Sequence, residues 1–235
     1  MLYLIGLGLN EEGISQEGLI AVKKCKKVYL ENYTVDFPYG LEALKNDFKK
    51  KIVCADREFV ESLKIVDEAK RLDVALLVYG SPLTATTHIS LIQEARECKV
   101  KYKIIYGASV FDAIAETGLQ VYKFGKITSM PKWQKNYNPT SFMEIVKENQ
   151  KINAHSLILI DIGLKLKDAL EELKKSAKEH GIKLNKIIIC SRLGTKNNRI
   201  FYDKIENLES KEIRLPYCFI IPGKLHFAEK EFLNQ

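Results

Sequence analysis

Glycine and hydroxyl side chains gather in three short stretches of the sequence, residues 6–10 (GLGLN), 80–84 (GSPLT) and 107–110 (GASV). Each stretch directly follows a run of apolar residues. Glycine lets a backbone approach a ligand closely or adopt a positive φ, and serine or threonine hydroxyls can donate hydrogen bonds to that ligand. These residue types at these positions indicate one composite pocket for a small molecule.

Three common chemistries are poorly supported at this pocket. A dinucleotide-binding G-x-G-x-x-G motif that starts at Gly6 needs a glycine at position 11, where Glu11 would face a pyrophosphate with the wrong charge. The chain lacks the G-x-x-x-x-G-K-[ST] motif of a kinase or ATPase, and Ser81 lacks the G-x-S-x-G context of a serine hydrolase. An NAD-dependent enzyme is therefore a lesser alternative.

Metal and disulfide chemistry also find little support. Single cysteines without C-x-x-C spacing favour neither a disulfide framework nor a zinc site, and a reducing cytoplasm fits them best. The histidines lie far apart in the sequence and are expected to be cap, core or surface residues, so no metal is expected. The cysteines are Cys25, Cys54, Cys98, Cys190 and Cys218, and the histidines are His88, His155, His180 and His226.

Composition and charge describe a globular chain without a membrane span. Hydrophobic residues make up 46% of the 235 residues, and no apolar stretch approaches the ~20 residues that a span needs. The start, MLYLIGLG, lacks the features of a secretory signal and is expected to be a strand. The net charge of +7 comes from 31 Lys and 6 Arg spread along the chain. Because nucleic-acid surfaces favour clustered arginine, we expect no nucleic-acid partner, with attraction to an acidic macromolecule as the alternative to a merely solvated surface.

The scaffold for the pocket is predicted to be a parallel sheet with helices on both faces. In the first half of the chain, short runs rich in β-branched or aromatic residues alternate with helical periodicity. One helix, after the Asp56 N-cap, is expected to carry Phe59, Leu63 and Val66 on one face. Loops at the carboxyl ends of parallel strands converge, so the three pocket stretches are expected at one edge. The expected strands cover residues 2–6, 28–30, 51–54, 74–80 and 103–107.

The second half of the chain keeps a mixed α/β character. A predicted helix stops at Gly118, and the domain boundary is placed there, giving an N-terminal α/β domain of residues 1–118 and a C-terminal α/β domain of residues 119–235. Ser141 with Glu144 predicts a capping box at the start of a helix. The expected strands cover residues 120–124, 156–162, 186–190 and 217–223.

Several longer motifs occur in a fixed order along nearly the whole chain. "ATTH" (85–88), "TGLQVYKFGK" (117–126) and "PGKLH" (222–226) are the most specific of them. In this order they resemble the diphthine synthase family, a branch of the tetrapyrrole-methylase-like S-adenosylmethionine (SAM) methyltransferases, and separate it from the porphyrin and corrin methylases. The other matching motifs are "LYLIGLGL" (2–9), "KKCKKVYLENYT" (23–34), "PTSFMEIVKEN" (139–149), "LILIDI" (157–162) and "SRLG" (191–194).

The resemblance implies an α/β protein of two domains, with a parallel N-terminal sheet flanked by helices and a C-terminal mixed sheet with helices. It also implies a homodimer with SAM in the cleft between the domains. The family usually has Asp where this chain has Ser81, so a neutral hydroxyl replaces a charged contact. By matching motif, the implied cofactor contacts are Leu9, Ser81, Thr84, Ser109, Val110, Ile160, Leu193 and Tyr217.

The implied substrate is a protein, translation elongation factor 2. Its acceptor is the amine of a 3-amino-3-carboxypropyl group on a histidine, methylated in sequence to the trimethylammonium product diphthine, as the archaeal members suggest. Each attack needs a free amine, so a proton must leave before it. His88 and Tyr33 are candidate bases. Solvent and the substrate's own carboxylate are the alternatives, so the sequence assigns no catalytic residue.

Three other functions stay open at this point. A tetrapyrrole or corrin methyltransferase of the same fold would act without a protein partner. A ribosomal RNA methyltransferase would show a continuous basic patch and a steep salt dependence of affinity. A noncatalytic SAM-binding interaction module would bind SAM and transfer no methyl group.

Overall fold

The computed structural model describes residues 1–234, without the side chains of residues 45–47. The chain forms two compact units, one covering Met1–Asp112 and the other beginning at Ala113. Helix α6 (Val110–Ala113) runs directly into the 3-10 helix η1 (Ile114–Thr117), so the chain passes from one unit to the next within a helical segment. The sequence-based boundary after Gly118 stays a prediction.

The first unit is built on a five-stranded sheet in the order β3-β2-β4-β1-β5. All of its strand pairs are parallel, as the apolar runs predict. Strands β1 and β4 are buried along their whole length, which is typical of a parallel sheet covered on both faces. The strands are β1 (Leu2–Gly6), β2 (Lys27–Glu31), β3 (Ile52–Ala55), β4 (Val74–Val78) and β5 (Tyr102–Ile105).

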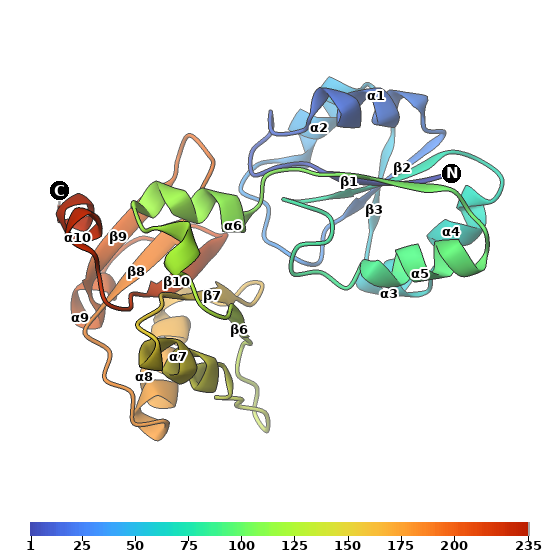
Figure 1. The fold of residues 1–235 in the computed structure, drawn as a ribbon. Helices are drawn as coiled ribbons and strands as arrows, with labels where there is room; N and C mark the ends of the chain where they lie inside the picture. Colours follow the sequence, from blue (N-terminus) through green and yellow to red (C-terminus); the bar gives the residue numbers. More distant parts are fainter. Residues whose placement is uncertain (235) are drawn as a thin grey trace. The chain divides into compact units, whose positions relative to one another are not determined.

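Helices cover both faces of this sheet, because successive strand residues point to opposite sides. In β1, Leu2 and Leu4 join one core cluster, and Tyr3 and Ile5 join the other. Figure 1 shows α1 (Gln16–Lys24) and α2 (Leu41–Phe48) on one face and α3 (Arg57–Glu61), α4 (Lys64–Ala69) and α5 (Ile89–Glu97) on the other.

The single helix expected after Asp56 is instead two. Asp56 does cap α3, its side chain accepting from the backbone N–H of Phe59 at 2.8 Å. Leu63 then adopts a φ of 61°, in the left-handed region, and this ends one helix and begins the other. The break lets Val60, Ile65 and Val66 all face the same core cluster.

The second unit is built on a mixed sheet in the order β6-β7-β10-β8-β9. Strands β6 and β7 are parallel, and β10 is antiparallel to both of its neighbours. The strands are β6 (Thr128–Met130), β7 (Ser156–Ile160), β8 (Lys186–Ser191), β9 (Arg199–Lys204) and β10 (Tyr217–Ile221). The mixed sheet agrees with the fold class expected from the sequence, although β6 and β9 were not among the expected strands.

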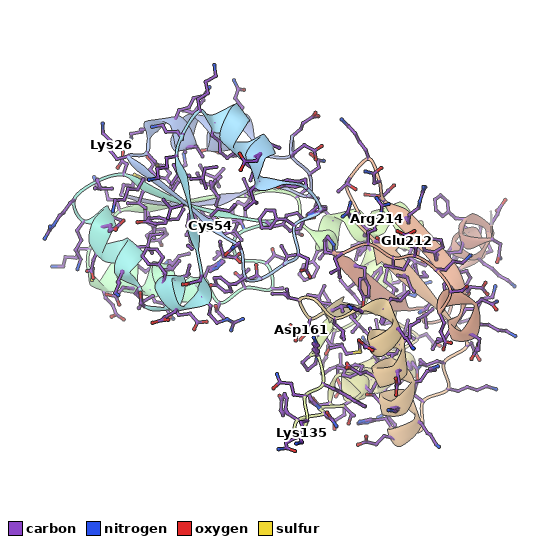
Figure 2. The ribbon with its side chains drawn as sticks, turned by 180° about the vertical axis from the view of Figure 1, so that it is seen from behind. Lys26, Cys54, Lys135, Asp161, Glu212 and Arg214 are labelled. Carbon is purple, nitrogen blue, oxygen red and sulfur yellow. The ribbon has the colours of Figure 1, made fainter. Side chains whose placement is uncertain are left out.

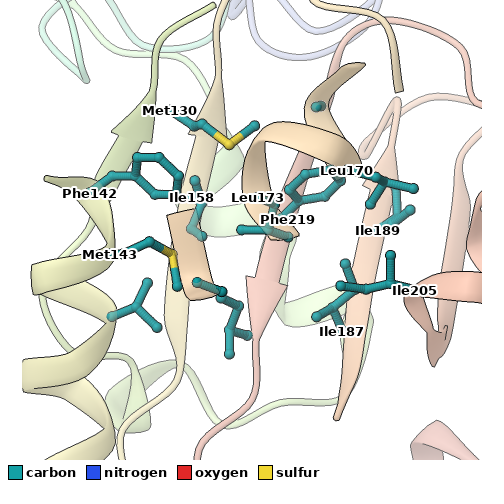
Figure 3. Packing of buried hydrophobic residues seen from close by; sticks show 14 of the residues in the cluster. Met130, Phe142, Met143, Ile158, Leu170, Leu173, Ile187, Ile189, Ile205 and Phe219 are labelled. Atoms are coloured by element: carbon teal, nitrogen blue, oxygen red, sulfur yellow. The ribbon is translucent and has the colours of Figure 1, made fainter. Parts of the chain in front are cut away.

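Two helices, α7 (Phe142–Lys151) and α8 (Leu166–Glu179), pack on this sheet. Their apolar faces meet the sheet in one cluster around Phe142, Ile158, Leu173 and Phe219 (Figure 3). Besides η1, the other helices of the unit are α9 (Ile205–Leu208), α10 (Phe227–Leu233) and the 3-10 helix η2 (Val121–Lys123). Within residues 1–234, none of the helices combines the length and the apolar character that crossing a bilayer requires.

Two local expectations for the second unit are wrong. The strand expected at residues 120–124 is the short helix η2, in which Tyr122 is 84% exposed, so its apolar residues do not reflect burial in a sheet. Ser141 precedes α7 as expected, but it adopts helical angles and its side chain makes no capping hydrogen bond. A side-chain cap needs an N-cap residue in the extended region, which Ser141 does not occupy.

Candidate functional site

In the first unit, the glycine-rich loops after β1 and β4 are joined through their backbones. Gly80 N–H donates to Gly8 O at 2.9 Å, and Gly8 N–H donates back to Gly80 O at 3.2 Å. Both glycines have positive φ values, 70° and 73°, which a side chain would strain. The loops therefore meet at the edge of the sheet, as their composition predicts.

The five site residues predicted for the first unit follow three neighbouring strands, β4, β1 and β5. Leu9, Ser81 and Ser109 are 7%, 8% and 6% exposed, and Thr84 and Val110 are partly buried. This unit therefore gathers its predicted site residues at one edge of its sheet, where ligands of parallel α/β sheets bind.

The three hydroxyls at this edge differ in what they can still bind. Ser109 Oγ accepts from the backbone N–H of Phe111 at 3.2 Å and donates to Asp112 Oδ2 at 3.0 Å, so it caps α6. The hydroxyls of Ser81 and Thr84 have no hydrogen-bond partner among the described residues. These two hydroxyls are available to a ligand.

His88 connects the loop after β4 to the loop after β2. Its Nδ1 lies 3.0 Å from Pro82 O, and because a carbonyl only accepts, Nδ1 carries the proton. In the neutral ring, Nε2 then accepts from the Tyr33 hydroxyl 3.4 Å away. The side chain is 1% exposed, so both ring nitrogens are used inside the protein.

The Tyr33 hydroxyl is a poor proton acceptor in this setting. Burial raises the pKa of Tyr33 to about 12, the carboxylates of Glu31 and Glu61 act in the same direction, and Arg57 opposes them. A phenol with so high a pKa stays protonated near neutral pH. The structure therefore favours Tyr33 as a hydrogen-bond donor to His88.

Glu31 places Tyr33 and was missed by the sequence reasoning. It is the last residue of β2, it is 1% exposed, and its carboxylate accepts from Tyr33 N–H at 2.8 Å and Thr34 N–H at 2.7 Å. A further bond at 2.7 Å comes from the Thr34 hydroxyl. One signal in the sequence could have indicated it: Glu31 directly follows the apolar run of residues 28–30. A carboxylate so close to a buried strand is rarely buried unless it has a partner.

In the second unit, the three predicted site residues also share one sheet edge. Ile160 ends β7, Leu193 follows β8, and Tyr217 begins β10. Because β10 is antiparallel to both β7 and β8, its start lies beside their ends, with Tyr217 opposite Ser191. Leu193 and Tyr217 are 5% and 7% exposed. The Tyr217 hydroxyl donates to Leu164 O at 2.8 Å, so it is already used within the core.

Glu116 holds the loop that carries Leu193, and this residue was also missed. Its Oε1 accepts from the backbone N–H of Gly194 at 3.0 Å, and its Oε2 accepts from the side chain of Asn198 at 2.5 Å. The partners lie 78 and 82 positions away in the sequence, so no local pattern indicates the contact. Glu116 is therefore a positioning residue for this loop.

Asp161 directly follows Ile160 and is labelled in Figure 2. Its two carboxylate oxygens accept from the backbone N–H groups of Ile162 at 2.9 Å and Lys132 at 3.0 Å. Among the described residues, His, Cys, Asp and Glu form no group of three that could hold a metal ion.

The fold and the strand-end loops define a class of protein, the α/β methyltransferases of the tetrapyrrole methylase type. Residues 1–209 match the family model of tetrapyrrole (corrin/porphyrin) methylases. The chain belongs to this family, within its diphthine synthase branch. This confirms the resemblance inferred from the motifs, and it makes the protein a SAM-dependent methyltransferase by class.

Relatives that match along nearly their whole length support the placement of this chain in the diphthine synthase branch of the family. The chain is 44% identical to the diphthine methyl ester synthase of Schizosaccharomyces pombe, over 100% of this chain and 93% of the relative. It is 37% identical to the diphthine synthase of Methanococcus maripaludis, over 100% and 98%. A crystal structure of diphthine synthase superimposes with a TM-score of 0.90 at 31% identity, covering 99% of this chain and 94% of that one.

Proposed function

We propose that this methyltransferase modifies translation elongation factor 2. In the proposed reaction, methyl groups pass from SAM to the amine of a 3-amino-3-carboxypropyl group on a histidine of the factor, and three transfers give diphthine. The observation that carries the proposal is similarity along the whole chain, at 44% and 37% identity, to yeast and archaeal enzymes that are both named for diphthine.

The proposed SAM contacts are the eight residues named from the sequence. Leu9, Ser81, Thr84, Ser109 and Val110 belong to one sheet edge of the first unit, and Ile160, Leu193 and Tyr217 belong to one sheet edge of the second.

The residues of the first unit fit such a ligand on their own geometry. Ser81 is 8% exposed and its hydroxyl is unpartnered among the described residues, as is that of Thr84. Beside them, a Cβ placed on Gly80 would be in ordinary van der Waals contact with Ala108 O at 3.7 Å, so this loop packs directly against the loop that carries Ser109. The two hydroxyls supply hydrogen bonds that fix the cofactor's orientation. When bound, SAM brings a methyl group that its sulfonium already activates.

His88 and Tyr33 are assigned to positioning in this proposal. His88 is occupied by Pro82 O and the Tyr33 hydroxyl, and the raised pKa of Tyr33 keeps its proton in place. The proton of the acceptor amine therefore leaves to solvent or to the substrate's own carboxylate. No side chain of this protein is assigned as a general base.

A fourth methyl transfer is the second candidate. The Schizosaccharomyces pombe relative, 44% identical over 100% of this chain, is named a diphthine methyl ester synthase. Forming a methyl ester requires transfer to a carboxylate oxygen in place of an amine. A carboxylate is ionised at neutral pH, so this step needs no proton removal.

Intact-mass analysis of elongation factor 2 carrying the unmethylated intermediate, after incubation with SAM and this enzyme, tests the proposal. Three added methyl groups that survive mild alkali support diphthine as the product. Four methyl groups, one of them released by alkali, support the methyl ester. Methylation of RNA or of a corrin in place of the factor would overturn both, and SAM binding without any transfer would indicate a noncatalytic module.

The assembly and location of the enzyme are part of the same proposal. We assign a homodimer acting in the cytoplasm, where its protein substrate works. Sedimentation at micromolar concentration should give the mass of two chains. A single chain of 26.9 kDa under these conditions would contradict the dimer.

A further inference from the structure

A groove of about 630 Å³ lies within the second unit, next to the start of β7 and the end of β10, whereas Ile160 and Tyr217 lie at the other ends of these two strands. Three segments line it, residues 122–124, 152–154 and 224–227. Residues 122–124 belong to "TGLQVYKFGK" and residues 224–226 belong to "PGKLH", the motifs that the proposed SAM contacts leave unexplained. The proposed SAM site therefore assigns no function to this groove.

A buried carboxylate holds the walls of this groove together. Glu229 is 1% exposed and accepts from the backbone N–H groups of Gln120 at 2.9 Å and His226 at 2.7 Å. It also accepts from Lys123 Nζ at 2.5 Å and His155 Nε2 at 3.2 Å. Four donors from three separate segments thus meet on one side chain.

The protonation of this network follows from its geometry. His155 Nδ1 accepts from the backbone N–H of Gly223 at 2.9 Å, so Nε2 carries the proton that it donates to Glu229. Burial lowers the pKa of His155, which keeps the ring neutral. Burial alone would raise the pKa of Glu229, but the donors of Lys123, Gln120 and His226 lower it to about 2. Glu229 is therefore ionised, and its negative charge balances the positive charge of Lys123.

Backbone bonds complete the frame. His155 N–H donates to Lys123 O and Gly125 N–H donates to His155 O, each at 2.9 Å. Lys123 Nζ also donates to Lys224 O at 2.9 Å, which ties the first segment to the third. The groove is held by hydrogen bonds inside the unit and needs no ligand to shape it.

Large apolar side chains stand in solvent around this fixed frame. Tyr122, Ile152 and Phe227 line the groove and are 84%, 71% and 76% exposed. Exposed apolar groups that cluster at a hollow with a polar rim mark interaction sites. Aromatic residues are also enriched among the residues that anchor protein interfaces.

The charge of the groove selects the kind of partner. None of its described lining residues is acidic. Lys224 is exposed and its Nζ has no hydrogen-bond or ion-pair partner among the described residues, while the charge of Lys123 is balanced by Glu229. The groove thus carries an unbalanced positive charge beside an apolar surface.

We propose that this groove docks an acidic segment of the protein substrate, with an apolar side chain seated between Tyr122, Ile152 and Phe227 and a carboxylate on Lys224. The inference rests on the proposed function, because it assigns the segment to the protein that is methylated. A second copy of this chain is a poor occupant, since a two-fold contact would bring two positively charged faces together.

The test compares groove variants with matched variants outside the groove. Phe227→Ala and Lys224→Glu change exposed groove residues, and Tyr137→Ala, at a residue 60% exposed, and Lys183→Glu are their controls. Binding of elongation factor 2 carrying the unmethylated intermediate is measured by calorimetry, together with KM for the factor and Kd for SAM.

Each groove variant should weaken binding of the factor and raise its KM about tenfold, with SAM affinity and the maximal rate unchanged. Lys224→Arg should restore most of the binding, and added salt should weaken the wild-type complex. Equal affinities in groove and control variants would overturn the proposal. So would a groove variant that dissociates the dimer, or competition for the groove by RNA. Failure of the wild-type enzyme to methylate the factor would instead count against the proposed function, because the binding measurement does not depend on transfer.

Discussion

Gly6 and Gly107 lie in such close contact that a Cβ placed on Gly6 would come within 2.6 Å of Gly107 N and 2.5 Å of Gly80 O. Real Cβ atoms essentially never approach backbone atoms so closely. The contact joins the ends of β1, β5 and β4, which are neighbours in the sheet. The close approach of these strand ends therefore depends on the absence of side chains at these positions.

Gly6→Ala should destabilise the protein by about 1–3 kcal/mol or more, because the methyl group forces backbone apart in a packed region. It should also weaken SAM binding. Gly40→Ala is the matched control, since a Cβ at Gly40 meets nothing within 4 Å, and it should change stability by less than about 0.5 kcal/mol. Urea unfolding measures both, and equal stabilities of the two variants would contradict the packing account.

His88→Ala should lower stability by about 1–3 kcal/mol, because it removes two hydrogen bonds, those of the His88 ring to Pro82 O and to the Tyr33 hydroxyl, and leaves Pro82 O with the Thr86 hydroxyl as its donor at 2.8 Å. It should also weaken SAM binding through the loop that carries Ser81 and Thr84. His88→Asn retains a donor and should recover part of both losses. If His88 were instead a general base, its loss would change the pH profile of the maximal rate and leave SAM binding unaffected.

Glu116→Ala should raise the Kd for SAM severalfold by freeing the loop of Leu193 and Gly194. Glu116→Gln keeps an acceptor for Gly194 N–H and should stay closer to the wild type. Because Glu116 acts through the loop, the maximal rate at saturating SAM should change less than the affinity. Calorimetry with SAM measures the affinities of the two variants and the wild type. Identical affinities of all three would contradict the positioning role of Glu116.

Acid should destabilise the second unit through Glu229. Its pKa is lowered from 4.5 to about 2 in the folded state, so its contribution is present above the unfolded pKa and is lost as pH falls through the folded one. The loss should therefore fall between about pH 4.5 and pH 2. Glu229→Gln should be less stable at neutral pH and show a shallower decline across this window. If stability fell with pH equally in the wild type and in Glu229→Gln, Glu229 would not be the group responsible for the acid sensitivity.

The strands of the parallel sheet, and the meeting of the loops after β1 and β4 at one edge of that sheet, were accessible from the sequence. Runs such as residues 74–78 are apolar throughout because both of their faces are buried, and glycines mark where those strands end. The place of Ser81 and Thr84 at this sheet edge was predictable for the same reason, since strand-end loops of a parallel sheet converge.

The features that sequence reasoning missed depend on partners far along the chain. Glu229 is bonded to Gln120, 109 positions away, and no local pattern carries that information. Residues 120–124 were expected to be a strand because their apolar side chains imitate strand periodicity, whereas Tyr122 and Phe227 are apolar and exposed around a groove. Periodicity reports burial in a core, and it misreads side chains that face solvent.

The reaction proposed for this enzyme is transfer of methyl groups from SAM to one histidine of elongation factor 2. The most direct measurement uses SAM with a labelled methyl group and two forms of the factor, one carrying the 3-amino-3-carboxypropyl group and one with an unmodified histidine. Label is expected on the modified histidine of the first form and none on the second. Label on both forms, or on neither while the enzyme binds SAM, would contradict it.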